Sequence, residues 1–208
     1  MNDHDNRLAL CALSNAGAQV TRRVEQRLNE IDAQAVFEDA LAYGGWGFDH
    51  HPPHGFHDKV NPSTHQYLRG PHNVPLRSLY SRNVANLFFA GRNISATHVA
   101  WGAIRLEPVW MQTGEAAGFA AALAVKAHTT PAALSADLLI RKLASSHVMI
   151  TFFNDVDVTS NDPQIASSQY FGTKGFFDSY DARLDAPLTA ALRTVWESAF
   201  KQLELGRL

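Results

Sequence analysis

The feature that most constrains this chain is a short apolar run ending in glycine, Asn86-Leu87-Phe88-Phe89-Ala90-Gly91. Four apolar residues before a glycine predict a short buried strand at residues 87–90, and a residue without Cβ lets another group approach the backbone closely. We therefore expect this strand to be central in its sheet and to present Gly91 to a ligand.

A second cluster of small residues follows in Thr113-Gly114-Glu115-Ala116-Ala117-Gly118. Small residues at a helix start leave the first N–H groups uncovered, and these groups together with the helix dipole favour an anionic or electron-rich partner. The sequence thus predicts a cofactor cradle made of the strand that ends at Gly91 and a helix that opens at Gly114. Ordinary packing of a buried strand against an alanine-rich helix is the alternative.

Polar residues capable of chemistry lie between the two clusters, namely Ser95, Thr97, His98 and Arg105. Histidine titrates near neutral pH and can act as an acid or a base, whereas arginine stays cationic and can stabilise a carboxylate or an alkoxide. The alternative is a packed helix in which His98 satisfies a backbone carbonyl and Arg105 pairs with Glu107.

Residues 86–118, together with Tyr43-Gly44-Gly45-Trp46 and Pro75-Leu76-Arg77-Ser78-Leu79-Tyr80-Ser81-Arg82-Asn83, resemble the C-terminal part of FAD-dependent oxidoreductases of the glutathione-reductase-2 type. The resemblance implies an α/β fold, FAD as the cofactor and a small-molecule substrate. It implies that His98 and Arg105 are catalytic and face the substrate. The cofactor-binding residues that it implies are Gly91, Arg92, Ser95, Gly114, Glu115, Ala116, Ala117 and Gly118, with residues 114–118 aiming backbone N–H groups at the flavin.

The glycine-rich loop that first holds FAD in that family, G-x-G-x-x-G, does not occur in these 208 residues. The resemblance therefore predicts a partial FAD-binding fold that lacks the N-terminal Rossmann strand and helix. We expect the chain alone to be inactive, and to associate with the missing N-terminal half or with itself. The alternative is a non-catalytic truncated remnant, or a partner or binding module.

The sequence divides into three expected parts. Residues 1–36 form an N-terminal segment that is the remnant of a substrate domain, and residues 37–128 form the C-terminal part of the FAD-binding domain. Residues 129–208 form a mostly helical appendage containing a single repeat that resembles an S-layer-homology repeat. Apolar spacing and turn residues predict helices at residues 20–31, 33–43, 131–145 and 190–203, and extended segments at residues 74–82 and 148–153. At residues 20–31 the resemblance implies a strand instead.

Composition excludes several classes of function. The chain is 46% hydrophobic and 18% charged, as in globular proteins, and its net charge of −2 argues against a nucleic-acid surface. The apolar run at residues 8–13 is too short for a signal peptide, and no run approaches the ~18 apolar residues of a membrane span. Localisation stays open, with the cytoplasm as the default.

Four histidines lie in the loop of residues 50–57, at His50, His51, His54 and His57. Zinc sites need ligands that converge from rigid elements, and two prolines splay this backbone. We therefore predict no native metal site.

Overall fold

The computed structural model describes residues 31, 33–50, 55–57, 59–60 and 64–205. Its strands form two separate antiparallel pairs, β1 with β4 and β2 with β3. Strands and helices follow in the order β1 (Ala40–Gly44), β2 (Phe48–His50), η2 (Gly55–His57), β3 (Thr64–Gln66), β4 (His72–Pro75), η3 (Leu76–Ser78), η4 (Gly91–Asn93), α3 (His98–Ile104), α4 (Glu107–Lys126), η5 (Pro131–Ala133), α5 (Ala136–Ser145), α6 (Gln164–Thr173) and α7 (Ala190–Glu204). The helix expected at residues 20–31 lies outside the described residues except for Ile31.

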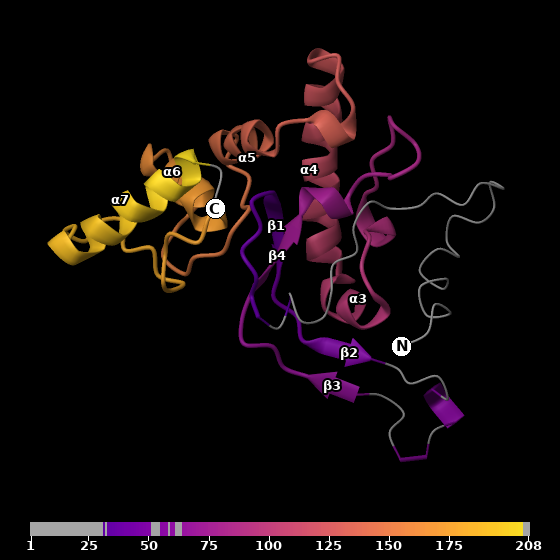
Figure 1. Ribbon diagram of the computed structural model, residues 1–208. Helices are drawn as coiled ribbons and strands as arrows, with labels where there is room; N and C mark the ends of the chain where they lie inside the picture. Colours follow the sequence, from indigo (N-terminus) through magenta and orange to yellow (C-terminus); the bar gives the residue numbers. More distant parts are fainter. Residues whose placement is uncertain (1–30, 32, 51–54, 58, 61–63, 206–208) are drawn as a thin grey trace.

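The pair β1 and β4 lies at the centre of the described structure, between α4 and the C-terminal helices α6 and α7 (Figure 1). Ala42 pairs with Val74 and Gly44 pairs with His72. Because side chains alternate along a strand, these four positions share one face. Val109 of α4 lies on that face, with its Cγ2 3.4 Å from where a Cβ on Gly44 would be. The opposite face of the pair is thus turned towards the C-terminal part of the chain.

Small side chains let α4 pack closely on β1. The buried residues of α4 recur three or four positions apart, as on one face of a helix. They are Val109, Thr113, Ala116, Ala117, Ala120 and Ala124. On the strand side, Ala40 and Ala42 are fully buried. The alanine-rich character of this helix is therefore explained by its contact with the strand.

The helix predicted at residues 33–43 is wrong, because the second half of this segment is strand β1. The carboxylate of Asp39 accepts a hydrogen bond of 2.9 Å from the Arg77 backbone N–H and pairs with the Arg77 guanidinium at 2.9 Å. Its backbone carbonyl accepts another, of 2.8 Å, from Leu76. These partners are distant in sequence, and such tertiary contacts override a local helical preference.

The central strand predicted at residues 87–90 is also wrong. The segment forms one isolated antiparallel bridge, between Tyr80 and Phe88, and the Phe89 N–H donates to the Leu79 carbonyl. Phe89 is buried, while Phe88 is only half-buried. The segment therefore lies beside residues 79–81 rather than inside a sheet.

The segment of residues 148–153 belongs to no strand among the described residues. The side-chain carbonyl of buried Gln169 accepts hydrogen bonds from the backbone N–H groups of Ile150, at 2.8 Å, and Thr151, at 3.1 Å. One glutamine side chain thus takes the place of a neighbouring strand. Sequence patterns do not reveal such a partner, since it comes from helix α6.

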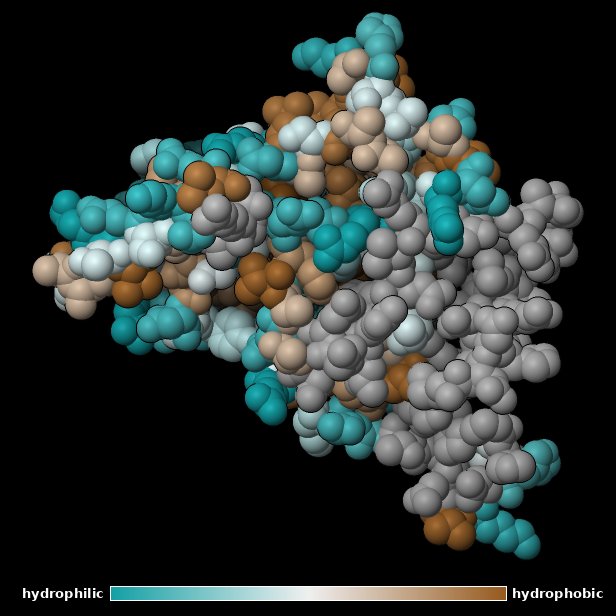
Figure 2. Space-filling model, viewed as in Figure 1, coloured by the Kyte–Doolittle hydropathy of each residue, from teal (hydrophilic) through white to brown (hydrophobic). Residues whose placement is uncertain are grey.

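The C-terminal helices agree with the sequence. The prediction at residues 131–145 is confirmed by η5 and α5, and the prediction at residues 190–203 by α7. Trp196 attaches α7 to the body, because its indole donates a 2.9 Å hydrogen bond to the Phe176 carbonyl and its ring lies 5.4 Å from that of Phe177. Hydrophobic and hydrophilic residues alternate over the surface of α7 (Figure 2). No helix in the described part of the chain is long and apolar enough to cross a bilayer.

His72 of β4 is a buried titratable residue that the sequence does not single out. Its side chain is 1% exposed, and neither ring nitrogen has a hydrogen-bond partner among the described residues. The ring occupies the space opposite Gly44, where a Cβ would lie 2.6 Å from Nε2. Burial disfavours the charged imidazolium and lowers the pKa of His72 to about 4.

We expect His72 to make the protein less stable in mild acid. The unfolded chain binds a proton at this histidine below a pKa of about 6.5. The folded chain does so only below about 4. The free energy of unfolding therefore has its full value above pH 6.5. It decreases as the pH falls from 6.5 towards 4, by about 3 kcal/mol in total. Urea unfolding at pH 7 and pH 5 measures this difference.

A variant and a direct titration provide the controls. His72→Phe removes the titrating group, so its free energy of unfolding should change less between pH 7 and pH 5 than that of the unmodified chain. If that variant does not fold, NMR titration of the His72 ring in the unmodified chain gives the pKa directly. A ring that protonates near pH 6.5 in the folded protein contradicts the prediction.

Candidate functional site

The most distinctive polar feature near Gly91 is the guanidinium group of Arg92, which lies close to the indole rings of Trp101 and Trp110. Gly91 has a φ of 65°, in the left-handed region that glycine adopts readily. The next residue, Arg92, places its guanidinium 5.1 Å from the ring centroid of Trp101 and 5.1 Å from that of Trp110. The Trp101 indole also donates a hydrogen bond of 3.5 Å to the Arg92 carbonyl. Cation–π attraction thus holds the Arg92 side chain against α3 and α4.

Arg105, the residue after α3, is held by a carboxylate from another element. Its guanidinium forms an ion pair with Asp49 of β2 and lies 6.0 Å from the Trp101 ring. The pairing with Glu107 that the alternative interpretation expects is therefore wrong. Gly102 brings the two elements together, because a Cβ at this position would lie 2.7 Å from the Asp49 backbone carbonyl.

The two arginines differ in their net electrostatic effect. Asp49 compensates the charge of Arg105, and both side chains are 27% exposed. Arg92 is exposed and has no carboxylate within ion-pair distance among the described residues. The uncompensated positive charge of this site therefore lies at Arg92, next to Gly91.

The helix expected to open at Gly114 begins earlier. α4 starts at Glu107, so Gly114 lies two turns inside it and its N–H belongs to the helical hydrogen-bond ladder. Pro108, in the first turn of α4, separates this helix from α3. The prediction of a helix N-terminus at residues 114–118 is wrong, and the backbone N–H groups there are not available to a ligand.

The five residues of this cluster lie on two sides of α4. Ala116 and Ala117 are buried, at 0% and 6% exposure, in the contact with β1. Glu115 is exposed, and a Cβ on Gly114 or on Gly118 would have no atom within 4 Å. The two glycines, one turn apart, leave an open strip on the outer side of α4. Trp110 precedes Gly114 by one further turn, so the strip continues from the indole.

Two buried polar atoms at this site lack a partner among the described residues. The Ser95 side chain is 0% exposed, and its Oγ makes no hydrogen bond. Its backbone N–H, in contrast, donates to the Ser78 carbonyl at 3.0 Å. The second atom is the indole Nε1 of Trp110. Unsatisfied buried polar atoms are uncommon in proteins and indicate a missing partner.

His98 is the first residue of α3, and its side chain lies outside the described residues. The histidine-rich loop of residues 50–57 also lies largely outside them. Both predictions, a catalytic histidine and a loop without a native metal, remain untested.

A family model described as FAD dependent oxidoreductase matches residues 19–144, which is more than half of the chain. The chain belongs to this family. Its cofactor is therefore FAD. No curated protein and no solved structure shows a significant similarity to the chain.

The residues at Arg92 fit the flavin end of such a cofactor. Arg92 supplies a positive charge, the strip at Gly114 and Gly118 leaves room beside it, and Ser95 and Trp110 carry polar atoms without partners. These are features that an electron-rich, polar, planar group requires of its binding surface. The backbone N–H groups of residues 114–118 do not fit, because the helix already uses them.

Sequence analysis missed much of this arrangement. It assigned no cofactor-binding or catalytic role to Trp101, Trp110, Asp49 or Gly102. One signal was available, because Trp101 and Arg105 are four residues apart and therefore lie on the same side of a helix. No local pattern connects Asp49 with α3, since that contact depends on how β2 packs.

Proposed function

We propose that η4 and the outer side of α4 form the flavin-facing wall of an FAD site in an oxidoreductase of the glutathione-reductase-2 type. Gly91, Arg92, Ser95, Gly114 and Gly118 belong to this wall. The observation that carries the proposal is the exposed Arg92 guanidinium, fixed by two indoles beside the open glycine strip.

The chemistry that bound FAD supplies is acceptance of a hydride from a substrate carbon. Arg92 contributes a fixed positive charge that stabilises negative charge developing beside it. Trp101 and Trp110 hold this guanidinium in place, so little reorganisation is needed when that charge develops. The Ser95 hydroxyl offers a hydrogen bond to a partner that reaches its buried site.

Towards the substrate, we propose catalytic roles for His98 and Arg105. Both belong to the segment of α3, directly beside the Arg92 cluster. The ion pair with Asp49 orients Arg105, and it leaves Arg92 as the stronger source of positive potential. Arg105 therefore acts by hydrogen bonding to a substrate oxygen rather than through net charge, and His98 acts as an acid or a base.

The flavin wall is tested by titrating FAD, at millimolar concentration, into the isotopically labelled 208-residue chain. We expect the amide resonances of Gly91 and Gly118 and the indole resonances of Trp101 and Trp110 to shift. Arg92→Met keeps much of the side chain but removes the charge, so it should weaken these changes about tenfold, the effect of losing one charge-assisted contact.

Arg193→Met is the matched control, because Arg193 is an exposed arginine of α7 that takes no part in this cluster. It should leave the FAD-induced shifts unchanged. Shifts confined to other parts of the chain, or equal weakening by both variants, contradict the proposal.

A further inference from the structure

A cavity lies on the face of the pair β1 and β4 that is opposite to α4 and the Arg92 site. Its volume is about 290 Å³. Tyr43 and Asn73 pair across the two strands and project to the face opposite Gly44 and His72, which contact α4. The other wall comes from residues 151–153 and 172–180, beyond the segment that matches the oxidoreductase family.

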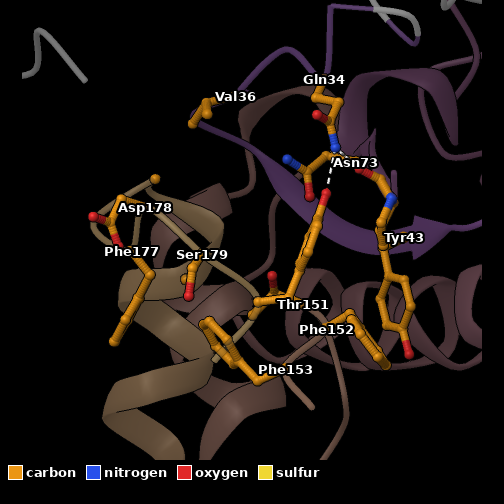
Figure 3. Close-up of a pocket in the computed structure, with 14 residues that line it drawn as sticks. Gln34, Val36, Tyr43, Asn73, Thr151, Phe152, Phe153, Phe177, Asp178 and Ser179 are labelled. Atoms are coloured by element: carbon orange, nitrogen blue, oxygen red, sulfur yellow. Dashed lines mark hydrogen bonds between the residues drawn. The ribbon is translucent and has the colours of Figure 1, made fainter. Parts of the chain in front are cut away.

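Aromatic rings provide much of the wall of this cavity. Figure 3 shows Phe177 and Asp178 on one side, and Tyr43 and Phe152 on the other. The rings of Tyr43 and Phe152 lie 6.0 Å apart, and Phe152 lies 6.0 Å from Tyr180. These three rings are therefore in contact with one another through Phe152, and together they form an electron-rich part of the cavity wall.

The rim of the cavity is built from tightly constrained residues. Gln34 has a φ of 51°, which is uncommon for a residue with a side chain. Its amide donates hydrogen bonds to the Tyr180 hydroxyl and, at 2.9 Å, to the Pro71 carbonyl. A Cβ on Gly70 would lie 2.8 Å from this amide nitrogen. Unusual backbone conformations and close approaches of this kind concentrate at binding sites.

Charge determines which ligand suits the cavity. Its lining contains one carboxylate, Asp178, and no lysine or arginine. The surrounding segment, residues 154–186, carries six aspartates and two basic residues, Lys174 and Arg183. Lys174 is buried, with its ammonium group hydrogen-bonded to the Glu38 carbonyl. The charge carried by the lining and by this segment is therefore mostly negative, which favours a cation over an anion.

We propose that this cavity binds a small alkylated ammonium ion. Aromatic faces attract such a cation through their quadrupoles, and Asp178 adds a direct charge interaction at the rim. The side-chain amides and hydroxyls of the lining complete the contacts to the polar end of the ligand. The site is independent of the flavin wall, because the two lie on opposite faces of β1 and β4.

Calorimetric titration of the full 208-residue chain with choline tests the proposal. Two further probes accompany it: 3,3-dimethylbutan-1-ol, the uncharged analogue in which carbon replaces the quaternary nitrogen, and glucose. We expect choline to bind with a Kd of roughly 1 mM, and the uncharged analogue to bind at least about fivefold more weakly. None of these three titrations uses FAD, so their outcome is separate from that for the flavin wall.

Variants then locate the binding. Asp178→Asn removes the carboxylate of the lining, and Phe152→Leu removes a ring while keeping an apolar side chain; each should weaken choline binding about three- to tenfold. Asp185→Asn is the matched control, because it removes the same charge from an exposed residue of the same segment outside the lining, so it should change the Kd less than about twofold.

Four results overturn the proposal. They are equal binding of choline and its uncharged analogue, tighter binding of glucose, equal effects of Asp178→Asn and Asp185→Asn, and no choline binding below about 50 mM, a concentration far above the expected Kd. Because Asp178 is exposed, its variant is expected to fold, so lost binding reports on the site rather than on unfolding.

Discussion

The purified 208-residue chain is expected to lose FAD during desalting. The adenosine and pyrophosphate ends of FAD bind a strand, a glycine loop and a helix carrying G-x-G-x-x-G, and these 208 residues contain no such motif. Each charge-assisted hydrogen bond that is not made costs about 1.5–3 kcal/mol, so three of them weaken binding by about a thousandfold or more. The wall at Arg92 alone therefore gives weak binding that ends when free FAD is removed.

The measurement is the visible flavin absorbance of the protein fraction after FAD is added and the sample is desalted. A parallel sample that is not desalted provides the control, since weak binding persists while FAD is present. A stoichiometric flavin band after desalting would show that these residues hold the cofactor unaided. If FAD binds weakly and Arg92→Met does not change this binding, the present prediction holds but the proposed flavin wall is contradicted.

Two glycines of neighbouring helices are expected to respond to the same substitution with opposite signs. A Cβ on Gly102 would lie 2.7 Å from the Asp49 carbonyl oxygen and 3.3 Å from the Asp49 nitrogen, both rigid backbone atoms. Gly102→Ala should therefore separate α3 from β2 and lower the free energy of unfolding by about 1–3 kcal/mol. A Cβ on Gly114 would meet no atom within 4 Å. Gly114→Ala should raise the free energy of unfolding by about 0.5–1 kcal/mol, because alanine favours the helix.

Urea unfolding of the two variants and of the unmodified chain measures both effects, with the slope of the transition checked for constancy. Each variant is the control for the other, since both replace a helical glycine by alanine. Gly102→Ala should also alter the Trp101 signal in near-ultraviolet circular dichroism, because the displaced β2 loosens Arg105 beside that ring. A stabilising Gly102→Ala would mean that the described packing of α3 on β2 is wrong, and a destabilising Gly114→Ala would mean that the outer side of α4 is not open at this position.

The two proposed sites lie on opposite faces of the strand pair β1 and β4. Gly44 and His72 face α4, whereas Tyr43 and Asn73 face the aromatic cavity of the proposed ammonium site. The Tyr43 backbone N–H donates a hydrogen bond of 3.1 Å to the side-chain carbonyl oxygen of Gln112 in α4. One short strand pair therefore separates the flavin wall from the proposed ammonium site and is rigidly attached to the helix that carries the first.

The sequence by itself determined the FAD-dependent oxidoreductase family, through motifs such as those at residues 75–83 and 86–118. It also determined the C-terminal helices, whose apolar spacing and capping residues are local. Ser135 and Thr189 illustrate why: each begins a helix by accepting a hydrogen bond from an N–H three residues later. Such signals depend only on neighbouring residues. They can therefore be read from the sequence without knowledge of the tertiary contacts.

Only the tertiary structure decided that residues 40–44 are a strand, that Gly114 lies inside a helix and that Arg105 pairs with Asp49. Each depends on a partner distant in sequence: β4 for the strand, β1 for the buried side of α4, and β2 for the arginine. An alanine-rich segment suits both a helix and a strand packed on small residues, so its own pattern does not choose between them. The contact energy of the partner makes that choice, and the same contacts set the Arg92 cluster and the aromatic cavity on opposite faces of the strand pair.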